Sequence, residues 1–128
     1  MRLPGYEEVV KALAAKSGLD HLSRAVVYVV STNSKSRAYA RIWGVPQPLQ
    51  EALGVGPAYI IELLPDFWAL SCRDKARVLA HELAHIPKTL SGSVRPHNRA
   101  FWRDYRLINA RADGVCDLIN SLGEGSKA

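Results

Sequence analysis

Cysteine is scarce in this chain, and the few cysteines do not form a metal-binding pattern. The 128 residues include two cysteines and no Cys-x-x-Cys pair, so neither a zinc ribbon nor a disulfide framework is indicated. We expect Cys72 and Cys116 to pack as small hydrophobic residues on helices.

Long apolar runs are also missing. No stretch approaches the length of a membrane span, and residues 1–8 offer no apolar signal core, which predicts a cytoplasmic protein with no membrane partner. The chain has no internal repeat or low-complexity tract, and residues 123–128 are expected to form a frayed end. A hydrophobic content of 48% over this length fits a single domain spanning residues 1–128.

Two of the four histidines form the most informative pattern. His81 and His85 lie four residues apart, with Glu82 directly after the first. On an α-helix the two imidazoles share one face and can reach one metal ion. Zinc held by three protein ligands keeps a fourth position for water and lowers the pKa of that water to about 7. Glu82 lies about 100° round the helix, where its carboxylate can act as base without occupying a coordination position.

The rest of this helix supports an exposed histidine pair. Ser71 is expected to cap its start, with Asp74 completing a capping-box pattern, and Pro87 to stop it just after the motif. The apolar stripe lies opposite the histidines on the helical wheel, so the histidines face a cleft or solvent. That stripe consists of Cys72, Ala76, Leu79, Leu83 and Ile86.

A third ligand has to come from the remaining histidines. His97 follows a turn-rich segment over residues 86–96 and stands at a predicted helix start, because Phe101 and Tyr105 follow at helical spacing. We take His97 as the candidate third ligand; the alternative is a histidine that merely caps or packs at the helix start. His21 lies in a predicted helix-end turn and is interpreted as an ordinary surface residue.

A His-Glu-x-x-His helix, a loop, and a histidine followed four residues later by an aromatic residue resemble the minimal zincin metallopeptidases. The likeness is to the SprT-like group and to the small metallopeptidases of phage and archaea, and it covers about residues 59–105. It implies one zinc ion per chain, held by His81, His85 and His97, with Glu82 as catalytic base. Asn98 departs from the glycine that SprT-like proteins commonly carry after the third histidine. The spacing of His97 also argues against the metzincin clan.

Three strands are predicted, over residues 25–30, 37–43 and 58–63. The second strand alternates between a small apolar face and a basic, aromatic face, and we expect it to form a hairpin with the first. In zincins the strand before the metal helix borders the cleft and often pairs with substrate, so the resemblance implies this role for residues 58–63. Glu62 is interpreted as an exposed strand residue rather than a cleft-lining group.

The remaining elements complete an α+β fold. A first helix is predicted over residues 6–16, and residues 44–57 are predicted to be a loop with one helical turn. The fold is then a small, mostly antiparallel sheet of about three strands, packed against the metal helix and flanking helices.

The leading functional hypothesis is a zinc-dependent metallopeptidase acting on a protein or peptide substrate. Tyr59, Arg95 and Tyr105 are candidates for transition-state or substrate contacts, by proximity in sequence only. Hydrolysis of a non-peptide bond stays open, because zinc hydroxide is not selective by itself.

The alternative hypothesis is a basic nucleic-acid-associated module with a structural or catalytically silent metal site. The net charge is +5, and several arginines follow His97: Arg99, Arg103, Arg106 and Arg111. Such a surface permits contact with nucleic acid, although a solvated face is the plainer interpretation. A closed structural site would need a fourth protein ligand, and the motif region offers none. A protease that also contacts nucleic acid would satisfy both hypotheses.

Overall fold

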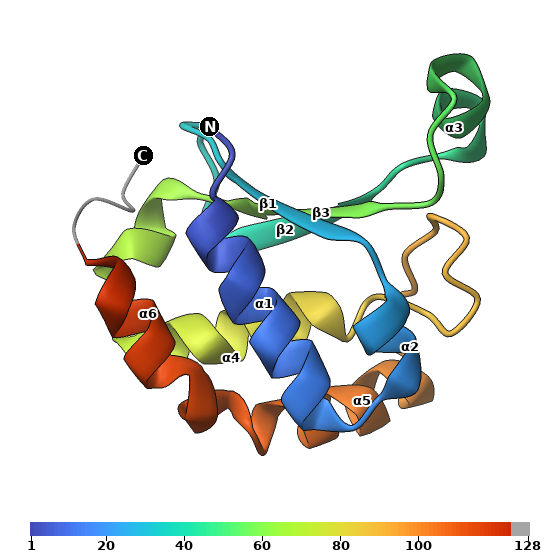
Figure 1. Ribbon diagram of the computed structural model, residues 1–128. Helices are drawn as coiled ribbons and strands as arrows, with labels where there is room; N and C mark the ends of the chain where they lie inside the picture. Colours follow the sequence, from blue (N-terminus) through green and yellow to red (C-terminus); the bar gives the residue numbers. More distant parts are fainter. Residues whose placement is uncertain (124–128) are drawn as a thin grey trace.

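A three-stranded sheet lies on one side of the molecule, and the helices α1, α4, α5 and α6 lie together on the other (Figure 1). This computed structural model describes residues 1–123, so most of the expected frayed end over residues 123–128 lies outside the described residues. The elements in chain order are α1 Pro4–Ser17, α2 Asp20–Arg24, β1 Val27–Ser31, β2 Ala40–Gly44, α3 Gln47–Leu53, β3 Tyr59–Leu63, the 3-10 helix η1 Pro65–Ala69, α4 Cys72–Leu83, α5 Arg99–Asn109, the 3-10 helix η2 Ala112–Val115 and α6 Cys116–Leu122.

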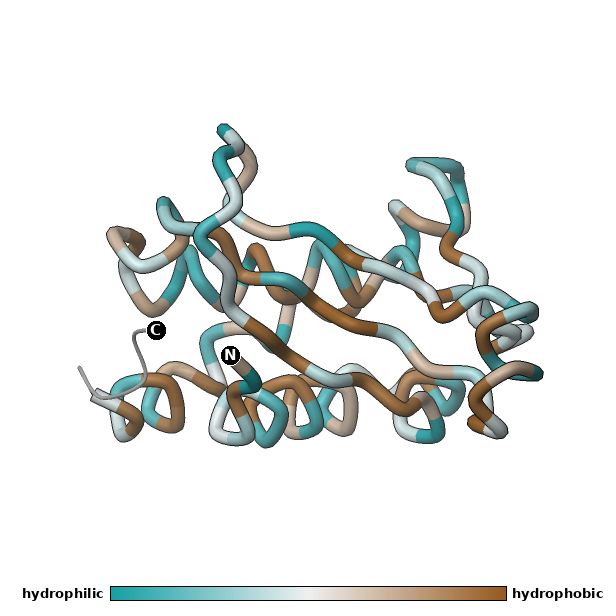
Figure 2. The backbone as a smooth tube through the Cα atoms, turned by 90° about the horizontal axis from the view of Figure 1, so that it is seen from above, coloured by the Kyte–Doolittle hydropathy of each residue, from teal (hydrophilic) through white to brown (hydrophobic). Residues whose placement is uncertain are grey.

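The sheet is mixed, with the strand order β1-β3-β2. β3 runs parallel to β1 and antiparallel to β2. The prediction of an α+β fold with three strands is confirmed, but the expected hairpin between the first two strands is wrong, because β3 lies between them. β3 suits the central place because its core-facing side chains Tyr59, Ile61 and Leu63 are at most 1% exposed. Hydrophobic residues are prominent along the strands when the sheet is viewed from above (Figure 2).

The outer edges of the sheet differ. The edge of β1 is extended by the N-terminus, since the Leu3 amide donates to the Val29 carbonyl at 2.8 Å and the Ser31 amide donates to the Met1 carbonyl at 2.8 Å. β3 is paired on both sides along its length. The expected role of residues 58–63 as the strand that receives substrate is therefore wrong, and the strand with an open edge beside α4 is β2.

α4 carries the histidine motif and begins as predicted. The Ser71 hydroxyl accepts a hydrogen bond from the Asp74 amide at 3.2 Å, which caps the first turn. The regular helix ends at Leu83, one turn before Pro87. The chain continues in a tighter turn, in which the His85 amide donates to the Glu82 carbonyl at 3.1 Å. The helical spacing of the motif is thus kept although the helix is shorter than expected.

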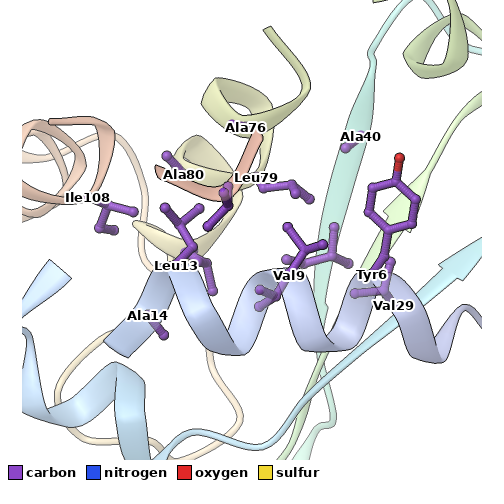
Figure 3. Packing of buried hydrophobic residues seen from close by; sticks show 14 of the residues in the cluster. Tyr6, Val9, Leu13, Ala14, Val29, Ala40, Ala76, Leu79, Ala80 and Ile108 are labelled. Carbon is purple, nitrogen blue, oxygen red and sulfur yellow. The ribbon is translucent and has the colours of Figure 1, made fainter. Parts of the chain in front are cut away.

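The apolar stripe of α4 packs against α1 and the sheet (Figure 3). Leu79 and Ala80 of α4 are fully buried, as are Val9 and Leu13 of α1. α1 matches the predicted helix closely and ends at Gly18, whose φ of 76° is the left-handed conformation that glycine adopts most easily. This core fixes one side of α4 and leaves the His81 side facing outward.

Cys72 and Cys116 form a disulfide, which the sequence analysis did not expect. It joins the first residue of α4 to the first residue of α6. The two residues are 44 positions apart in sequence, but their Cα atoms are 5.4 Å apart. In the part of the chain that the structure describes, no helix combines the length and apolarity that a membrane crossing requires.

Candidate metal centre

Three histidines from two separate parts of the chain meet at one point. His81 lies in the last turns of α4, His85 lies two residues beyond its end, and His97 directly precedes Asn98, the N-cap of α5. One ring nitrogen from each residue lies within 4.8 Å of the other two. The ring centroids are 4.8 to 5.3 Å apart. The predicted approach of His97 to the motif is therefore what the structure shows.

The hydrogen bonds around the cluster leave suitable nitrogens free for a metal. His85 Nδ1 donates to the Arg95 carbonyl at 2.6 Å, so the proton is on Nδ1 and Nε2 presents a lone pair. His81 Nδ1 lies 3.1 Å from Glu82 Oε2, which likewise leaves Nε2. Burial lowers the pKa of His85, which favours the neutral, metal-binding form. Two ligand nitrogens on a tetrahedral zinc ion stand about 3.4 Å apart, so this cluster is close to the spacing that zinc requires.

Phe101 forms the floor beneath the cluster. Its ring is fully buried, and its centroid lies 5.0 Å from that of His81, 4.6 Å from His85 and 4.7 Å from His97. The aromatic residue four positions after the third histidine thus contacts all three candidate ligands. The Phe101 ring therefore packs against the buried side of the three imidazoles and does not cover the side that faces the groove.

Asn98 has a local role that accounts for its place after His97. Its side-chain oxygen accepts a hydrogen bond from the Phe101 amide at 2.9 Å, so Asn98 caps α5. Because Asn98 directly follows His97, this hydrogen bond also fixes the short turn between His97 and Phe101. Asparagine in place of the glycine common in SprT-like proteins is therefore compatible with the site.

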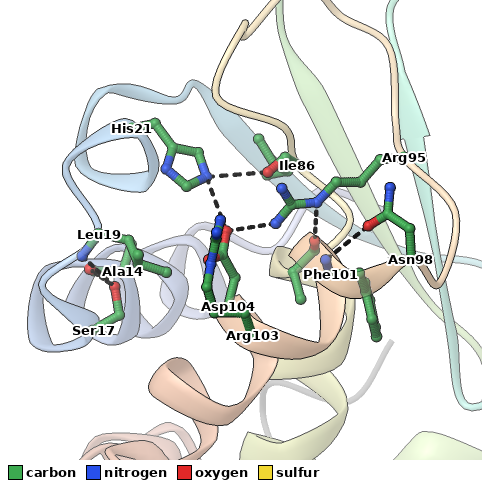
Figure 4. Close-up of polar contacts among 11 residues, drawn as sticks. Ala14, Ser17, Leu19, His21, Ile86, Arg95, Asn98, Phe101, Arg103 and Asp104 are labelled. Carbon is green, nitrogen blue, oxygen red and sulfur yellow. Dashed lines mark hydrogen bonds and ion pairs between the residues drawn. The ribbon is translucent and has the colours of Figure 1, made fainter.

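Arg95 ties the loop before His97 to both neighbouring helices (Figure 4). Its Nε donates to the Ala84 carbonyl at 2.9 Å, and its Nη2 donates to Asp104 Oδ2 at 2.5 Å. Its amide donates to the His85 carbonyl at 2.8 Å. The guanidinium is thus engaged behind the cluster, and the Arg95 backbone carbonyl orients His85. Arg95 acts as a positioning residue in this geometry, a role that differs from the substrate contact predicted for it.

Asp104 is the centre of a buried polar group that also contains His21. Asp104 is 1% exposed, and its Oδ2 accepts a hydrogen bond from the Arg95 guanidinium. Arg103 Nε lies 3.3 Å from the other oxygen, Oδ1. His21 Nε2 donates to the Ile86 carbonyl at 3.1 Å and lies 3.8 Å from Asp104. The interpretation of His21 as a surface residue is wrong: its side chain is 4% exposed and lies between the Ile86 carbonyl and Asp104. Burial lowers the pKa of His21.

The tip of the loop is held by Tyr59, which does not reach the cluster. The Tyr59 hydroxyl donates to the Ser93 carbonyl at 3.2 Å and accepts from the Gly92 amide at 3.0 Å. Burial raises the pKa of this phenol. Gly92 has a φ of 96°, and a Cβ there would lie 2.3 Å from the Val45 carbonyl oxygen, so this position requires glycine. Tyr59 therefore orders the loop that carries His97.

Two hollows meet at His81 and Glu82. An open groove of about 630 Å³ runs past His85 and His97 along residues 40–43 of β2. A second hollow of about 360 Å³ continues toward the start of α4 and is bordered by Tyr105. Glu82 is 7% exposed and borders both. The Tyr105 ring centroid lies 5.9 Å from that of His81, and Tyr105 lines the second hollow, whereas Arg95 lines the open groove.

The chain matches the family described as "Putative phage metallopeptidase" over residues 1–123. It belongs to this metallopeptidase family. No curated protein and no solved structure matches it. The cluster of His81, His85 and His97 could hold a metal ion, which fits membership in a metallopeptidase family.

The outer edge of β2 borders the three-histidine cluster. The Leu64 amide donates to the Tyr39 carbonyl, and the Val45 amide donates to the Ala58 carbonyl, both at 3.0 Å. Antiparallel pairing alternates, so residues 39, 41, 43 and 45 face β3. The backbone groups of Ala40 and Ile42 then point toward the outer edge. Within residues 1–123 these backbone groups have no strand partner, so the groove offers hydrogen-bond donors and acceptors next to the three histidines.

Glu62 lies on the face of the sheet that the long helices leave uncovered, yet it is buried. It accepts hydrogen bonds from Thr32 at 2.5 Å, from Trp43 Nε1 at 2.9 Å and from Arg41 at 3.1 Å. Burial acts to raise the pKa of Glu62, but these three donors outweigh it and the pKa is lowered. The interpretation of Glu62 as exposed is wrong, because the polar side chains of β2 fold over it.

Proposed function

We propose that this chain is a zinc-dependent metallopeptidase in which His81, His85 and His97 hold one zinc ion. The observation that carries the proposal is the meeting of three imidazole nitrogens beside Glu82, in an open groove, in a chain of a metallopeptidase family. Three imidazole ligands with an open side suit a catalytic zinc ion better than a closed structural one. A bound zinc ion polarises the peptide carbonyl and lowers the pKa of water to about 7.

Glu82 is placed to move the proton in this reaction. Its carboxylate is almost buried, lies next to His81 and borders the groove where a substrate carbonyl must approach the cluster. Glu82 takes a proton from the attacking water and later gives it to the leaving amine. Tyr105, at the border of the second hollow, is the best-placed side chain to donate a hydrogen bond to the developing oxyanion.

The edge of β2 is the proposed binding strand for an extended peptide. Backbone groups of Ala40 and Ile42 point into open space next to the histidines and can pair with a peptide by strand addition. Pairing of this kind fixes the peptide backbone without selecting its side chains. It places a peptide carbonyl over the histidine cluster and supports a protein or peptide as substrate.

Replacement Glu82→Gln tests the assignment of the base. The variant keeps the shape of the side chain and should retain zinc, while kcat/KM on a pool of quenched fluorescent peptides falls by roughly 10²- to 10⁴-fold. Glu8→Gln is the control for the same chemical change, because Glu8 is an exposed glutamate on α1, outside both hollows at the cluster, whose ion pair with Lys11 is 3.9 Å long. Turnover by Glu82→Gln at the rate of the control would rule out Glu82 as the base.

Two further expectations stay predictions. Arg99, Arg106 and Arg111 are exposed and offer positive charge for contact with nucleic acid; the test is a binding constant whose logarithm falls linearly with the logarithm of salt concentration. A cytoplasmic location is likewise a proposal.

A further inference from the structure

The second hollow at the cluster contains a cation that no described residue neutralises. Arg77 lies four positions before His81 on α4, so the two side chains share one helix face about one turn apart. Arg77 is exposed and lines the hollow of about 360 Å³ together with His81 and Glu82. Its guanidinium makes no ion pair or hydrogen bond to any side chain within residues 1–123.

Neighbouring arginines show that this is a feature of Arg77 and not of the helix. Arg73, one turn earlier on α4, is held by both carboxylate oxygens of Asp113 at 2.8 and 3.0 Å. Arg41, on the facing strand, is held by Glu62 at 3.1 Å. Arg77 is the guanidinium that borders the space next to the candidate catalytic glutamate and has no carboxylate of its own.

The other walls of the hollow suit a short chain that ends in a carboxylate. Ala38 and Ala40 leave room on the strand side, and Val78 offers an apolar surface one position after Arg77. Tyr105 borders the same space with a phenol group that can donate a hydrogen bond. A guanidinium and a phenol donor beside an apolar surface can recognise a carboxylate by charge-assisted hydrogen bonds.

We propose that this hollow is a specificity pocket that selects an acidic side chain, glutamate or aspartate, on the substrate residue next to the bond that is cleaved. The proposal rests on the proposed peptidase function, since it is the shared walls His81 and Glu82 that make the pocket adjacent to the reacting carbonyl. Arg77 is the residue that determines this preference. The apolar part of the selected side chain lies along Ala40 and Val78, and its carboxylate meets Arg77.

The first test uses the zinc-loaded protein and quenched peptides that differ only by glutamate or glutamine at one position. The protein should cleave the glutamate peptide with about tenfold higher kcat/KM, the lower end of the range for a hydrogen bond to a charged group, because Arg77 is solvent-exposed. Arg77→Gln should abolish this preference, so that kcat/KM for the glutamate peptide falls to the value for the glutamine peptide. Arg77→Glu should reverse it in favour of a lysine peptide. Arg106→Gln, an exposed arginine outside the pocket, should keep the preference.

A second readout does not depend on turnover. The zinc-loaded Glu82→Gln variant should bind the glutamate peptide about tenfold more tightly than the glutamine peptide, and adding Arg77→Gln should remove the difference. Binding with this preference but no cleavage of any peptide by the unaltered protein would support the pocket and overturn the peptidase proposal. Cleavage with equal rates for the two peptides, or with a preference for an aromatic residue that Arg77→Gln leaves intact, would overturn the pocket.

Discussion

Replacement of Arg95 by methionine tests how the loop that carries His97 is held. The change removes the guanidinium that donates to the Ala84 carbonyl and to Asp104, and it keeps a side chain of similar length. Asp104 is 1% exposed and the Arg95 side chain is 10% exposed, so the change leaves a buried carboxylate without its closest cation. Breaking such a pair costs about 3 to 5 kcal/mol. We expect the lower value, about 3 kcal/mol, because Arg103 still reaches Asp104 at 3.3 Å.

The assay is urea unfolding of the metal-free protein, with the free energy of unfolding obtained by linear extrapolation and an unchanged slope. Arg73→Met is the matched control, since the Arg73 and Asp113 side chains are 61% and 63% exposed and such a pair contributes at most about 1 kcal/mol. The double variant Arg95→Met with Asp104→Leu should recover much of the loss, because no charge is left buried. Equal losses for Arg95→Met and Arg73→Met would refute the reasoning.

Arg95→Met should also weaken zinc binding, because Arg95 orients His85 through its carbonyl and fixes the loop before His97. Groups that orient metal ligands typically contribute 10- to 100-fold in affinity, and a loss in about that range is expected here. A competition assay with a zinc chelator measures it. Unchanged affinity in a destabilised variant would show that the loop holds His97 without this ion pair.

Two other predictions concern the fold. Replacing both Cys72 and Cys116 by alanine should lower the free energy of unfolding by up to about 4 kcal/mol, which is the loop-closure value for a separation of 44 residues. The prediction is contradicted if the oxidised protein and the double variant unfold at the same denaturant midpoint. The pKa of His21 is lowered by burial, so the folded state binds fewer protons than the unfolded state below about pH 6.5, and stability falls as pH drops from 7 to 5. His21→Gln should flatten this slope by up to about 1.4 kcal/mol per pH unit, and an identical slope in the variant would show that His21 does not titrate there.

The histidine motif could be predicted because its signal is local. The four-residue spacing of His81 and His85 and the opposite apolar stripe both follow from helix geometry, and the structure has the stripe buried and the pair outward. His97 could be added because proline and glycine mark a loop and Phe101 marks the next helix. What Phe101 does beneath the three rings was not predicted, although its position after His97 was the available signal.

The errors all involve contacts between distant segments. Strand alternation shows which side of β2 is apolar, but it does not show that β3 lies between β1 and β2. The pairing of Cys72 with Cys116 depends on how α6 crosses the start of α4, and a separation of 44 residues carries no such information. His21 and Glu62 are polar residues with partners from other elements, His21 with the Ile86 carbonyl and Glu62 with Thr32 and Trp43. A single sequence shows polarity but not partners, which is why both were placed on the surface.

The measurement that tests the central claim most directly is the zinc content of the purified protein by elemental analysis, compared with His97→Ala. We predict about one zinc ion per chain, lost or much weakened in His97→Ala, because three ring nitrogens within 4.8 Å of one another form the site. His21→Gln is the control, since His21 is the histidine outside the cluster and should leave the zinc content unchanged. A protein that stays metal-free after zinc is supplied, or that binds zinc equally well without His97, would contradict the account.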